Sequence, residues 1–375
     1  MRTILGCGLS GFAAAIALAQ KGEDVRILDR SSRVGSKFPE SVHAFRNYNS
    51  SVDELEFIRS RGFAIDHLLP IHKIIKFGPS LNASETYSEE KPLFYAVKRG
   101  NGKESIDYQL FKLAENLQVE IQLGTNNASK NVDILATGSA FATEMGYGYH
   151  FKNVEVDPDS IVFLLNDYYA PKGYAYAIPY GSNEISVVTT SFDPSSFNKM
   201  PLLFKRLIEE VGIFSNLIKN GERGPAFAKI GSAFIPDTAI VNGRLLVGEA
   251  AGFAEADRGF GMHYALESGF LAAKSITENL NYDSLWKDSF RQELVKAFGR
   301  RMILNRIGNE HYDKMINAGT KMSAQEYAGY KDEHSTNLIK QFLIDMQIAN
   351  EIRKSRKKFD IRRFYMRFLE NEGVS

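Results

Sequence analysis

Cysteine is almost absent from this 375-residue sequence, in which Cys7 is the only one. A single cysteine excludes an intramolecular disulfide framework, a CxxC redox pair and a cysteine zinc cluster. We therefore expect a reducing compartment, the cytoplasm. We expect Cys7 itself to be a small buried side chain rather than a reactive thiol.

Excess charge and long apolar runs are also lacking. The formal net charge is only +1, so the basic field of a dedicated nucleic-acid-binding protein is missing and no nucleic-acid partner is expected. The apolar stretch at 12–19 is too short to span a bilayer, and no secretion signal is predicted. The seven histidines are scattered without metal-ligand spacing, so no metal site is predicted.

The clearest motif that is present opens the chain. A short apolar strand at 2–5 runs into a glycine-rich turn, and a helix-forming run follows at 12–20. The next strand is expected at 25–28, and Asp29 ends it. Strand, GxGxxG turn, helix, strand and acid in this order predict a dinucleotide-binding βαβ unit. The turn reads Gly6-Cys7-Gly8-Leu9-Ser10-Gly11.

Each glycine of the turn has a physical reason. Gly6 permits the tight turn, Gly8 lets the backbone approach a pyrophosphate, and Gly11 lets helix and strand pack closely. The helix N-terminus stabilises the phosphate charge, and Asp29 is expected to bind the adenosine ribose. Ser10 and Arg30 complete the candidate cofactor-binding residues here, with an NADP 2′-phosphate contact as the weaker interpretation of Arg30. The alternative is a glycine turn with a capping aspartate.

Two later segments favour FAD over NAD as the dinucleotide. Ser105 is expected to cap a helix, and a buried strand from Val132 then ends in the small residues Ala136, Thr137 and Gly138, which let a backbone lie close to a cofactor. Further on, a strand at 244–247 runs into Gly248 and Glu249, whose carboxylate is placed to hold ribityl hydroxyls.

A long helix follows the turn Gly259-Phe260-Gly261-Met262. Its positive N-terminal end would face the pyrimidine edge of a flavin, where negative charge appears on reduction. Small residues then recur at helical spacing, which allows the helix to pack closely against the sheet. Gly259, Gly261 and Met262 are therefore candidate cofactor-binding residues.

Taken in order, these motifs resemble FAD-dependent oxidoreductases of the p-hydroxybenzoate hydroxylase fold, and within them the geranylgeranyl reductase family. The resemblance spans roughly residues 1–300. It is carried by GCGLSG, Asp29, Arg99 before SID-x-x-L, ATG, and GEAAGFAEADRGFGMHYALESGFLAA. It implies that Arg99 reaches the FAD, although alone Arg99 would be taken for a solvated surface residue.

The segment Gly173 to Gly181, GYAYAIPYG, resembles the reductase motif YxWxFPxG of the substrate domain. Tyr174, Tyr176 and Phe260 are therefore candidates for the substrate pocket, and the catalytic residue itself stays unassigned. An aromatic hairpin packing its own core is the alternative. The chain departs from the family pattern at Glu249 for Asp, Tyr176 for Trp, Ala256 for Pro, and Phe260 for a small or acidic residue.

No second GxGxxG with strand and acid occurs, so a separate NAD(P)H domain is not expected. The electrons would come from transiently docked NAD(P)H or from a redox partner protein such as ferredoxin. His263 begins the helix after the glycine turn. It is a candidate proton donor near the flavin, with a packing or surface histidine as the alternative.

The end of the chain is basic, with eight lysines or arginines and four acidic residues in 351–375. An amphipathic helix is predicted there, with an apolar face formed by Ile361, Phe364, Tyr365, Phe368 and Leu369 and a basic face formed by Arg362, Arg363 and Arg367. Such a helix suits peripheral contact with an anionic membrane. The alternative is a helix docked on the protein with solvated arginines.

We therefore predict an α/β fold with a Rossmann-type FAD-binding domain, an antiparallel-sheet substrate domain and a helical C-terminal extension. The FAD-binding domain is assigned to 1–70, 98–150 and 225–280, the substrate domain to 71–97 and 151–224, and the helical region to 281–375. The predicted function is FAD-dependent reduction of carbon–carbon double bonds in an apolar or lipid, isoprenoid-like substrate. The alternatives are an aromatic monooxygenase on the same fold and a lipid-binding protein without redox activity.

Overall fold

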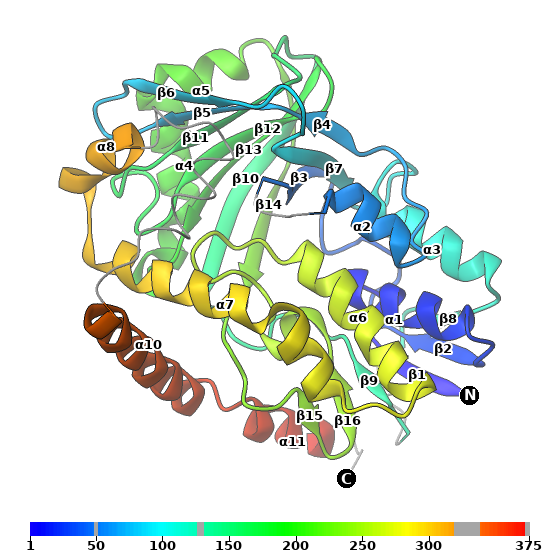
Figure 1. The fold of residues 1–375 in the computed structure, drawn as a ribbon. Helices are drawn as coiled ribbons and strands as arrows, with labels where there is room; N and C mark the ends of the chain where they lie inside the picture. Colours follow the sequence, from blue (N-terminus) through cyan, green and yellow to red (C-terminus); the bar gives the residue numbers. More distant parts are fainter. Residues whose placement is uncertain (49–51, 126–130, 319–337, 372–375) are drawn as a thin grey trace.

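The computed structural model describes residues 1–48, 52–125, 131–318 and 338–371. Its first sheet has six strands in the order β15-β16-β9-β1-β2-β8 (Figure 1). All neighbouring pairs are parallel except β15 with β16. The strands are β1 (Arg2–Leu5), β2 (Val25–Leu28), β8 (Glu120–Gln122), β9 (Ile134–Leu135), β15 (Ile240–Val241) and β16 (Arg244–Leu246).

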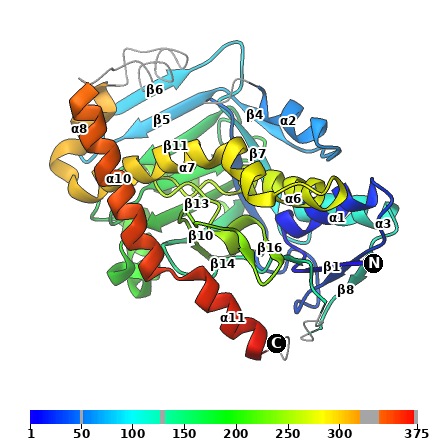
Figure 2. The same ribbon diagram turned by 60° about the horizontal axis from the view of Figure 1, so that its bottom comes forward.

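Helix α1 (Leu9–Ala19) connects β1 to β2 and is buried from Leu9 to Leu18. It packs against α6 (Met262–Thr277) and α3 (Ile106–Asn116), and the three helices lie side by side in both views (Figures 1 and 2). A Cβ at Gly269 of α6 would lie 2.4 Å from the Ser10 carbonyl oxygen. The sequence predicts that the small residues of this helix pack against the sheet, whereas in the structure Gly269 allows close contact with helix α1.

The second sheet has seven strands in the order β14-β10-β13-β12-β11-β5-β6. Only the pair of β11 with β5 is parallel. The strands are β5 (Lys73–Phe77), β6 (Ala83–Tyr87), β10 (Glu144–Lys152), β11 (Ser160–Leu164), β12 (Ala175–Pro179), β13 (Glu184–Ser191) and β14 (Glu222–Gly231). Most of β10 and most of β14 come from segments assigned to the FAD-binding domain. The exact domain boundaries stay a prediction.

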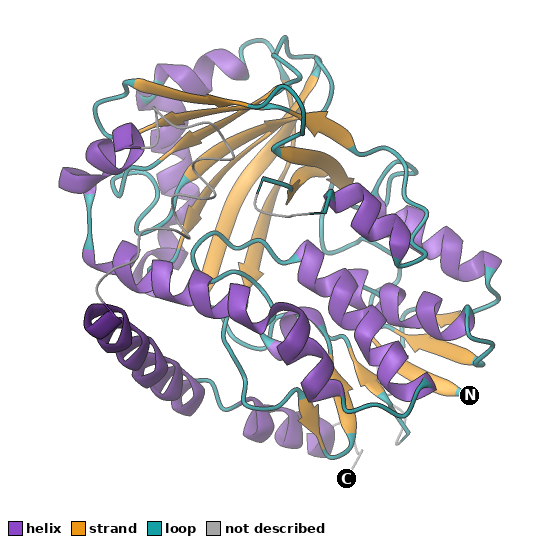
Figure 3. Cartoon of the chain, viewed as in Figure 1, coloured by secondary structure: helices purple, strands orange, loops and turns teal. Residues whose placement is uncertain are grey.

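Different elements pack on the two faces of this sheet. Helices α4 (Met200–Glu210) and α5 (Gly212–Leu217) pack on one face (Figure 3). A three-stranded sheet of order β3-β7-β4 packs on the other, where the Val42 amide donates to Ser186 Oγ at 2.7 Å. Its strands are β3 (Ser41–Arg46), β7 (Phe94–Arg99) and β4 (Leu69–Ile71).

The rest of the described chain is mainly helical. Its longer helices are α7 (Tyr282–Arg306), α8 (Asn309–Ala318), α10 (Leu338–Lys358) and α11 (Ile361–Asn371), and shorter elements are α2 (Glu54–Ser60), η1 (Pro194–Lys199) and η2 (Gly248–Ala251). Within the residues described, no helix is both long and apolar enough to cross a bilayer. The α/β class, the antiparallel second sheet and the helical C-terminal region are confirmed.

Helix α11 packs its apolar face against the domain formed by the six-stranded sheet and its helices, hereafter the first domain. Ile361 and Tyr365 are buried in the same core as α1, and Phe364 packs on Phe141 with the ring centroids 5.3 Å apart. The basic residues of the opposite face, Arg362, Arg363 and Arg367, are exposed. The side chain of Leu369 lies outside the described residues. This face therefore packs on protein, as in the alternative interpretation of the sequence.

Candidate functional site

The glycine-rich turn is held by close backbone contacts that only glycine permits. Gly6 has a φ of +112°, and a Cβ there would lie 2.2 Å from the Ala136 carbonyl oxygen. A Cβ at Gly11 would lie 1.9 Å from the Gly6 carbonyl oxygen. The N-terminus of α1 is therefore fixed directly beside the ends of β1 and β9.

Gly8 differs from these two glycines because a Cβ there would meet no protein atom within 4 Å. It is the N-cap of α1 and supplies no side-chain hydrogen bond to the helix. Gly261, the N-cap of α6, likewise supplies none. Two helix N-termini thus present backbone N–H groups, as an anionic pyrophosphate and a flavin ring require. These residues fit FAD.

Asp29 lies at the end of β2, against the same turn. Its carboxylate accepts the Cys7 amide at 2.8 Å and the Ser31 amide at 2.7 Å. Burial alone would raise the pKa of Asp29, but these backbone donors outweigh it and lower the pKa. The ionised carboxylate thus stabilises the turn through hydrogen bonds to backbone amides, as the capping alternative requires. A contact between Asp29 and a ribose stays a prediction. The neighbouring Arg30 is exposed.

Ala136, Thr137 and Gly138 follow β9 at this edge of the sheet, and Gly138 has a φ of +78°. The Thr137 hydroxyl shares a hydrogen bond of 2.7 Å with the buried Tyr365 hydroxyl on α11. The sequence did not single out Tyr365 as a site residue, because its partner is 228 positions away. Helix α11 thus contacts Thr137, one of the predicted cofactor-binding residues after β9.

Arg99 is the last residue of β7 and is buried. Its Nε and Nη2 donate to the two oxygens of Asp107 at 2.8 and 2.9 Å, and its guanidinium lies 4.5 Å from the Phe38 ring centroid. Without the family resemblance, Arg99 would be taken for a solvated surface residue. The structure shows that it is buried and ion-paired. Its predicted contact with FAD stays untested, and Asp107 is the partner that the sequence reasoning missed.

Glu249 lies in η2, close to the start of α6. Its Oε1 is 3.6 Å from Lys229 Nζ, and its Oε2 accepts a short hydrogen bond from the Ser139 hydroxyl. A Cβ at Gly261 would lie 3.6 Å from Glu249 Oε1. Burial would raise the pKa of Glu249, but Lys229 and Lys37 lower it overall. The ionised carboxylate of Glu249 therefore lies close to the N-terminus of α6, with Gly248 beside it in the chain.

One cavity brings the predicted pocket residues to the predicted flavin turn. It contains about 800 Å³ of empty space, part of which is open to solvent. Its walls come from β3, β7, β10, β11, β12, β13, β14 and the turn before α6. Among its lining residues are Tyr174, Tyr176, Gly259, Phe260, Gly261 and Met262, together with Glu144, Lys229 and His43, which the sequence reasoning missed.

Burial raises the pKa values of Tyr174 and Tyr176, so both phenols stay neutral at physiological pH. The Tyr174 hydroxyl donates to the Arg258 carbonyl oxygen and thereby ties β12 to the turn. Tyr174 and Tyr176 lie with their ring centroids 5.7 Å apart. The motif GYAYAIPYG thus contributes to the cavity wall instead of only packing within its own hairpin.

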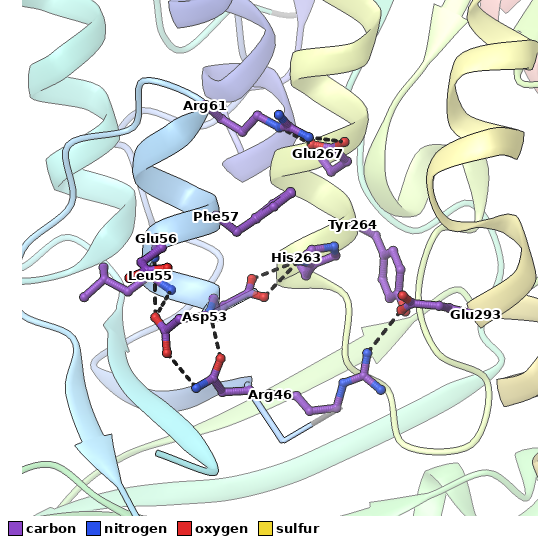
Figure 4. Close-up of polar contacts among 12 residues, drawn as sticks. Arg46, Asp53, Leu55, Glu56, Phe57, Arg61, His263, Tyr264, Glu267 and Glu293 are labelled. Atoms are coloured by element: carbon purple, nitrogen blue, oxygen red, sulfur yellow. Dashed lines mark hydrogen bonds and ion pairs between the residues drawn. The ribbon is translucent and has the colours of Figure 1, made fainter. Parts of the chain in front are cut away.

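His263 faces α2 (Figure 4). Its Nδ1 lies 2.9 Å from Glu54 Oε1, and its ring packs on Phe57 with the centroids 4.6 Å apart. Burial lowers the pKa of His263, but the Glu54 carboxylate outweighs this and raises it. Arg61, the C-cap residue of α2, pairs with Glu267, which lies one turn after His263 on α6, at 2.8 Å. His263 therefore links α2 to α6, as in its packing interpretation.

Comparisons with known proteins agree with this geometry. Residues 4–52 match the model of an NAD(P)-binding Rossmann-like domain. A digeranylgeranylglycerophospholipid reductase of Methanothermobacter thermautotrophicus is 27% identical over 45% of this chain and 45% of its own length. A digeranylgeranylglycerophospholipid reductase of Methanocaldococcus jannaschii is 20% identical over 84% of this chain and 89% of its own. The chain spans less than half the length of the first two curated relatives it matches.

Solved structures share the whole fold. A geranylgeranyl bacteriochlorophyll reductase-like protein of Thermoplasma acidophilum superposes with a TM-score of 0.70, at 16% identity, over 95% of this chain and 98% of that one. A flavin-dependent brominase has a TM-score of 0.58 at 14% identity, over 96% of this chain and 98% of that one. The chain has the fold of these proteins, and the predicted resemblance to geranylgeranyl reductases is confirmed.

Proposed function

We propose that this chain binds FAD and uses it to reduce carbon–carbon double bonds of an apolar, isoprenoid-like substrate. One observation carries the proposal. The turn expected to hold the flavin, Gly259 to Met262, and the aromatic residues Tyr174 and Tyr176 line a single cavity. The similarity to digeranylgeranylglycerophospholipid reductases supports the choice of an isoprenoid lipid.

In this proposal, Gly8 and the N-terminus of α1 bind the pyrophosphate, and Glu249 orients the ribityl chain. The uncapped N-terminus of α6 stabilises negative charge at the flavin pyrimidine. FAD supplies the hydride when it is bound and reduced. Tyr174, Tyr176 and Phe260 orient the apolar substrate beside it and exclude water from the cavity.

The test is a single-turnover reaction. Purified protein is loaded with FAD, reduced anaerobically with dithionite and mixed with an unsaturated digeranylgeranylglycerophospholipid. The proposal predicts that the yellow oxidised flavin returns and that the lipid gains two hydrogen atoms per reduced bond, as measured by mass spectrometry. A holoprotein that leaves the lipid unchanged contradicts it.

Flavin-dependent halogenases and an oxygenase share this fold. The reaction with oxygen is therefore tested in a separate experiment. Reduced holoprotein is mixed with oxygen and a phenolic probe. Incorporation of oxygen into the probe would favour the monooxygenase alternative, whereas plain reoxidation counts against it. Protein that takes up no FAD would favour the lipid-binding alternative.

The electron donor, NAD(P)H or a redox partner protein such as ferredoxin, stays a prediction. So do the cytoplasmic location and contact of the basic C-terminal helix with a membrane. Its exposed Arg362, Arg363 and Arg367 remain available to anionic lipid. Sedimentation with anionic and neutral vesicles tests this contact, because only the anionic vesicles should carry the protein down.

A further inference from the structure

The wall of the same cavity contains a carboxyl group, that of Glu144, to which the proposed function assigns no role. Glu144 is the first residue of β10, and only 7% of it is exposed. It lines the cavity together with Tyr174, Tyr176 and Gly259. Among the residues that the structure describes, its Oε2 has no hydrogen-bond partner. Buried polar groups are normally satisfied, so this oxygen requires an explanation beyond folding.

Two glycines leave room for this carboxyl group. Gly231 stands opposite Glu144 in the pairing of β14 with β10, and a Cβ at Gly231 would lie 2.1 Å from Glu144 Oε1. Gly259 has a φ of +70°, and a Cβ there would lie 2.7 Å from both Glu144 oxygens. The backbone of the predicted flavin turn therefore packs directly against the carboxyl head.

Several charged or titratable groups act on Glu144 from the elements around it. They are Lys229 on β14, Glu249 in η2, Asp257 in the turn before α6, Arg301 on α7, and Tyr174 and Tyr176 at β12. Burial is the largest influence and raises the pKa of Glu144 to about 7, with Lys229 opposing it and Glu249 adding to it. A large fraction of this carboxyl group is thus protonated near neutral pH.

We propose that Glu144 is the proton donor of the double-bond reduction, an inference that rests on the proposed function. Adding two hydrogens breaks the carbon–carbon π bond and forms two C–H bonds. Reduced FAD, when bound, would supply the hydride and be oxidised by two electrons. The Glu144 carboxyl group gives its proton to the other carbon, becomes a carboxylate and takes a proton back from water.

Other groups lining the described cavity are poorer donors. The phenols of Tyr174 and Tyr176 have raised pKa values and so hold their protons more tightly than a free tyrosine. Burial lowers the pKa of His43 well below its ordinary value, which leaves a neutral ring. Lys229 lies 3.6 Å from Glu249 and is engaged with its carboxylate.

The test compares wild type, Glu144→Gln and Glu222→Gln as FAD-loaded proteins. Glu222 is a matched control, because it is exposed at the far end of β14 on the same strand pair. After dithionite reduction, each is mixed with the unsaturated digeranylgeranylglycerophospholipid. Glu144→Gln should retain FAD and slow lipid-dependent reoxidation about a hundredfold or more, the usual loss when a general acid is removed. Glu144→Asp should recover part of the rate.

Two pH experiments complete the test. The single-turnover rate of wild type should fall as the pH rises through about 7, whereas the residual rate of Glu144→Gln should not. Infrared difference spectra of wild type against Glu144→Gln should show one protonated-carboxyl band that disappears over the same pH range. This readout needs no lipid and is absent if Glu144 serves only to pack the sheet as a carboxylate.

Each outcome is decisive. A Glu144→Gln protein that reduces the lipid at the wild-type rate overturns the inference, and so does a wild type without the titrating infrared band. If wild-type holoprotein does not reduce the lipid at all, the proposed function fails, and the infrared titration alone then shows whether Glu144 holds a proton near neutral pH. Loss of FAD from Glu144→Gln would make it a cofactor-binding residue and also overturn the inference.

Discussion

At the scale of single residues, the GxGxxG turn combines glycines that are needed for different reasons. Gly6 and Gly11 are required by protein atoms that lie too close for any Cβ. Gly8 has an ordinary φ of −79° and open space beside it. The protein itself therefore tolerates a side chain at position 8, and only a ligand there would exclude one.

Gly8→Val should accordingly abolish retention of FAD while leaving the fold intact. The valine side chain would occupy the space through which the pyrophosphate approaches the N-terminus of α1. The flavin content of purified protein, read from its visible spectrum, checks this. The matched control is Arg367→Ala on the exposed face of α11, which should keep wild-type flavin content. Equal flavin content in Gly8→Val would show that the cofactor does not bind at this turn.

Gly11→Ala should instead destabilise the fold. Its Cβ would lie 1.9 Å from the Gly6 carbonyl oxygen, a backbone atom that cannot move without displacing β1. Such overpacking costs about 1–3 kcal/mol and occasionally more. Urea unfolding of the FAD-free protein measures the loss, with Gly8→Ala expected to change the free energy of unfolding by less than about 0.5 kcal/mol. Similar values for the two variants would refute the distinction.

Glu144 also makes a prediction about stability. Its pKa is raised from an ordinary value of 4.5 to about 7, so its contribution is fully present below pH 4.5 and is lost as the pH rises through 7. The loss amounts to about 3 kcal/mol at most. Wild type should therefore become less stable relative to Glu144→Gln across this interval, as measured by urea unfolding at several pH values. A constant difference between the two proteins would contradict the raised pKa.

At the scale of elements, helices α2 and α6 are joined by polar contacts at both ends of their interface (Figure 4). The Asp53 carboxylate caps α2 by accepting the Leu55 amide at 2.9 Å. His263 and Glu54 pair near the start of α6, and Arg61 and Glu267 pair further along. Only the first pair contains a group that titrates near neutral pH.

This pair should make stability depend on pH. The pKa of His263 is raised above its ordinary value of 6.5, so its stabilising effect is complete below pH 6.5 and disappears as the pH rises through the higher folded value. The melting temperature of wild type should fall relative to Glu54→Gln over that range. A parallel pH dependence in both proteins would show that the pair contributes nothing.

Helix α11 depends on its contacts with the first domain, and the buried hydroxyl of Tyr365 is one of them. Tyr365→Phe removes its hydrogen bond to Thr137 and should cost about 1 kcal/mol in the free energy of unfolding. Tyr365→Ala also leaves a cavity and should cost about 3–5 kcal/mol. Urea unfolding of the two variants checks this order. A Tyr365→Ala protein as stable as wild type would mean that the helix is not docked in solution.

These elements also show what the sequence allowed and what it did not. The strand, turn and helix of residues 2–20 were predictable, because each depends on residues close together in the chain. The packing of α11 on the first domain could be foreseen only as one of two interpretations. The pairing of β10 with β14 joins residues about 80 positions apart, and local periodicity holds no information about such partners.

At the scale of the whole molecule, the cavity forms where the seven-stranded sheet, the three-stranded sheet and the turn before α6 meet. Motifs identified Tyr174, Tyr176 and Gly259 to Met262 for this region. Glu144 and His43 carry no local signal that sets them apart from other polar residues at strand positions. Their role depends on the tertiary arrangement, which was not predictable from the sequence alone.

The central claim is that distant glycine-lined turns converge on one FAD molecule beside this cavity. A crystal structure of the FAD-loaded protein tests it most directly. The account predicts the pyrophosphate at Gly8 and the flavin ring system against Gly259 to Met262, facing Tyr174 and Tyr176. A flavin bound elsewhere, or a cavity closed by protein side chains in the loaded protein, would contradict it.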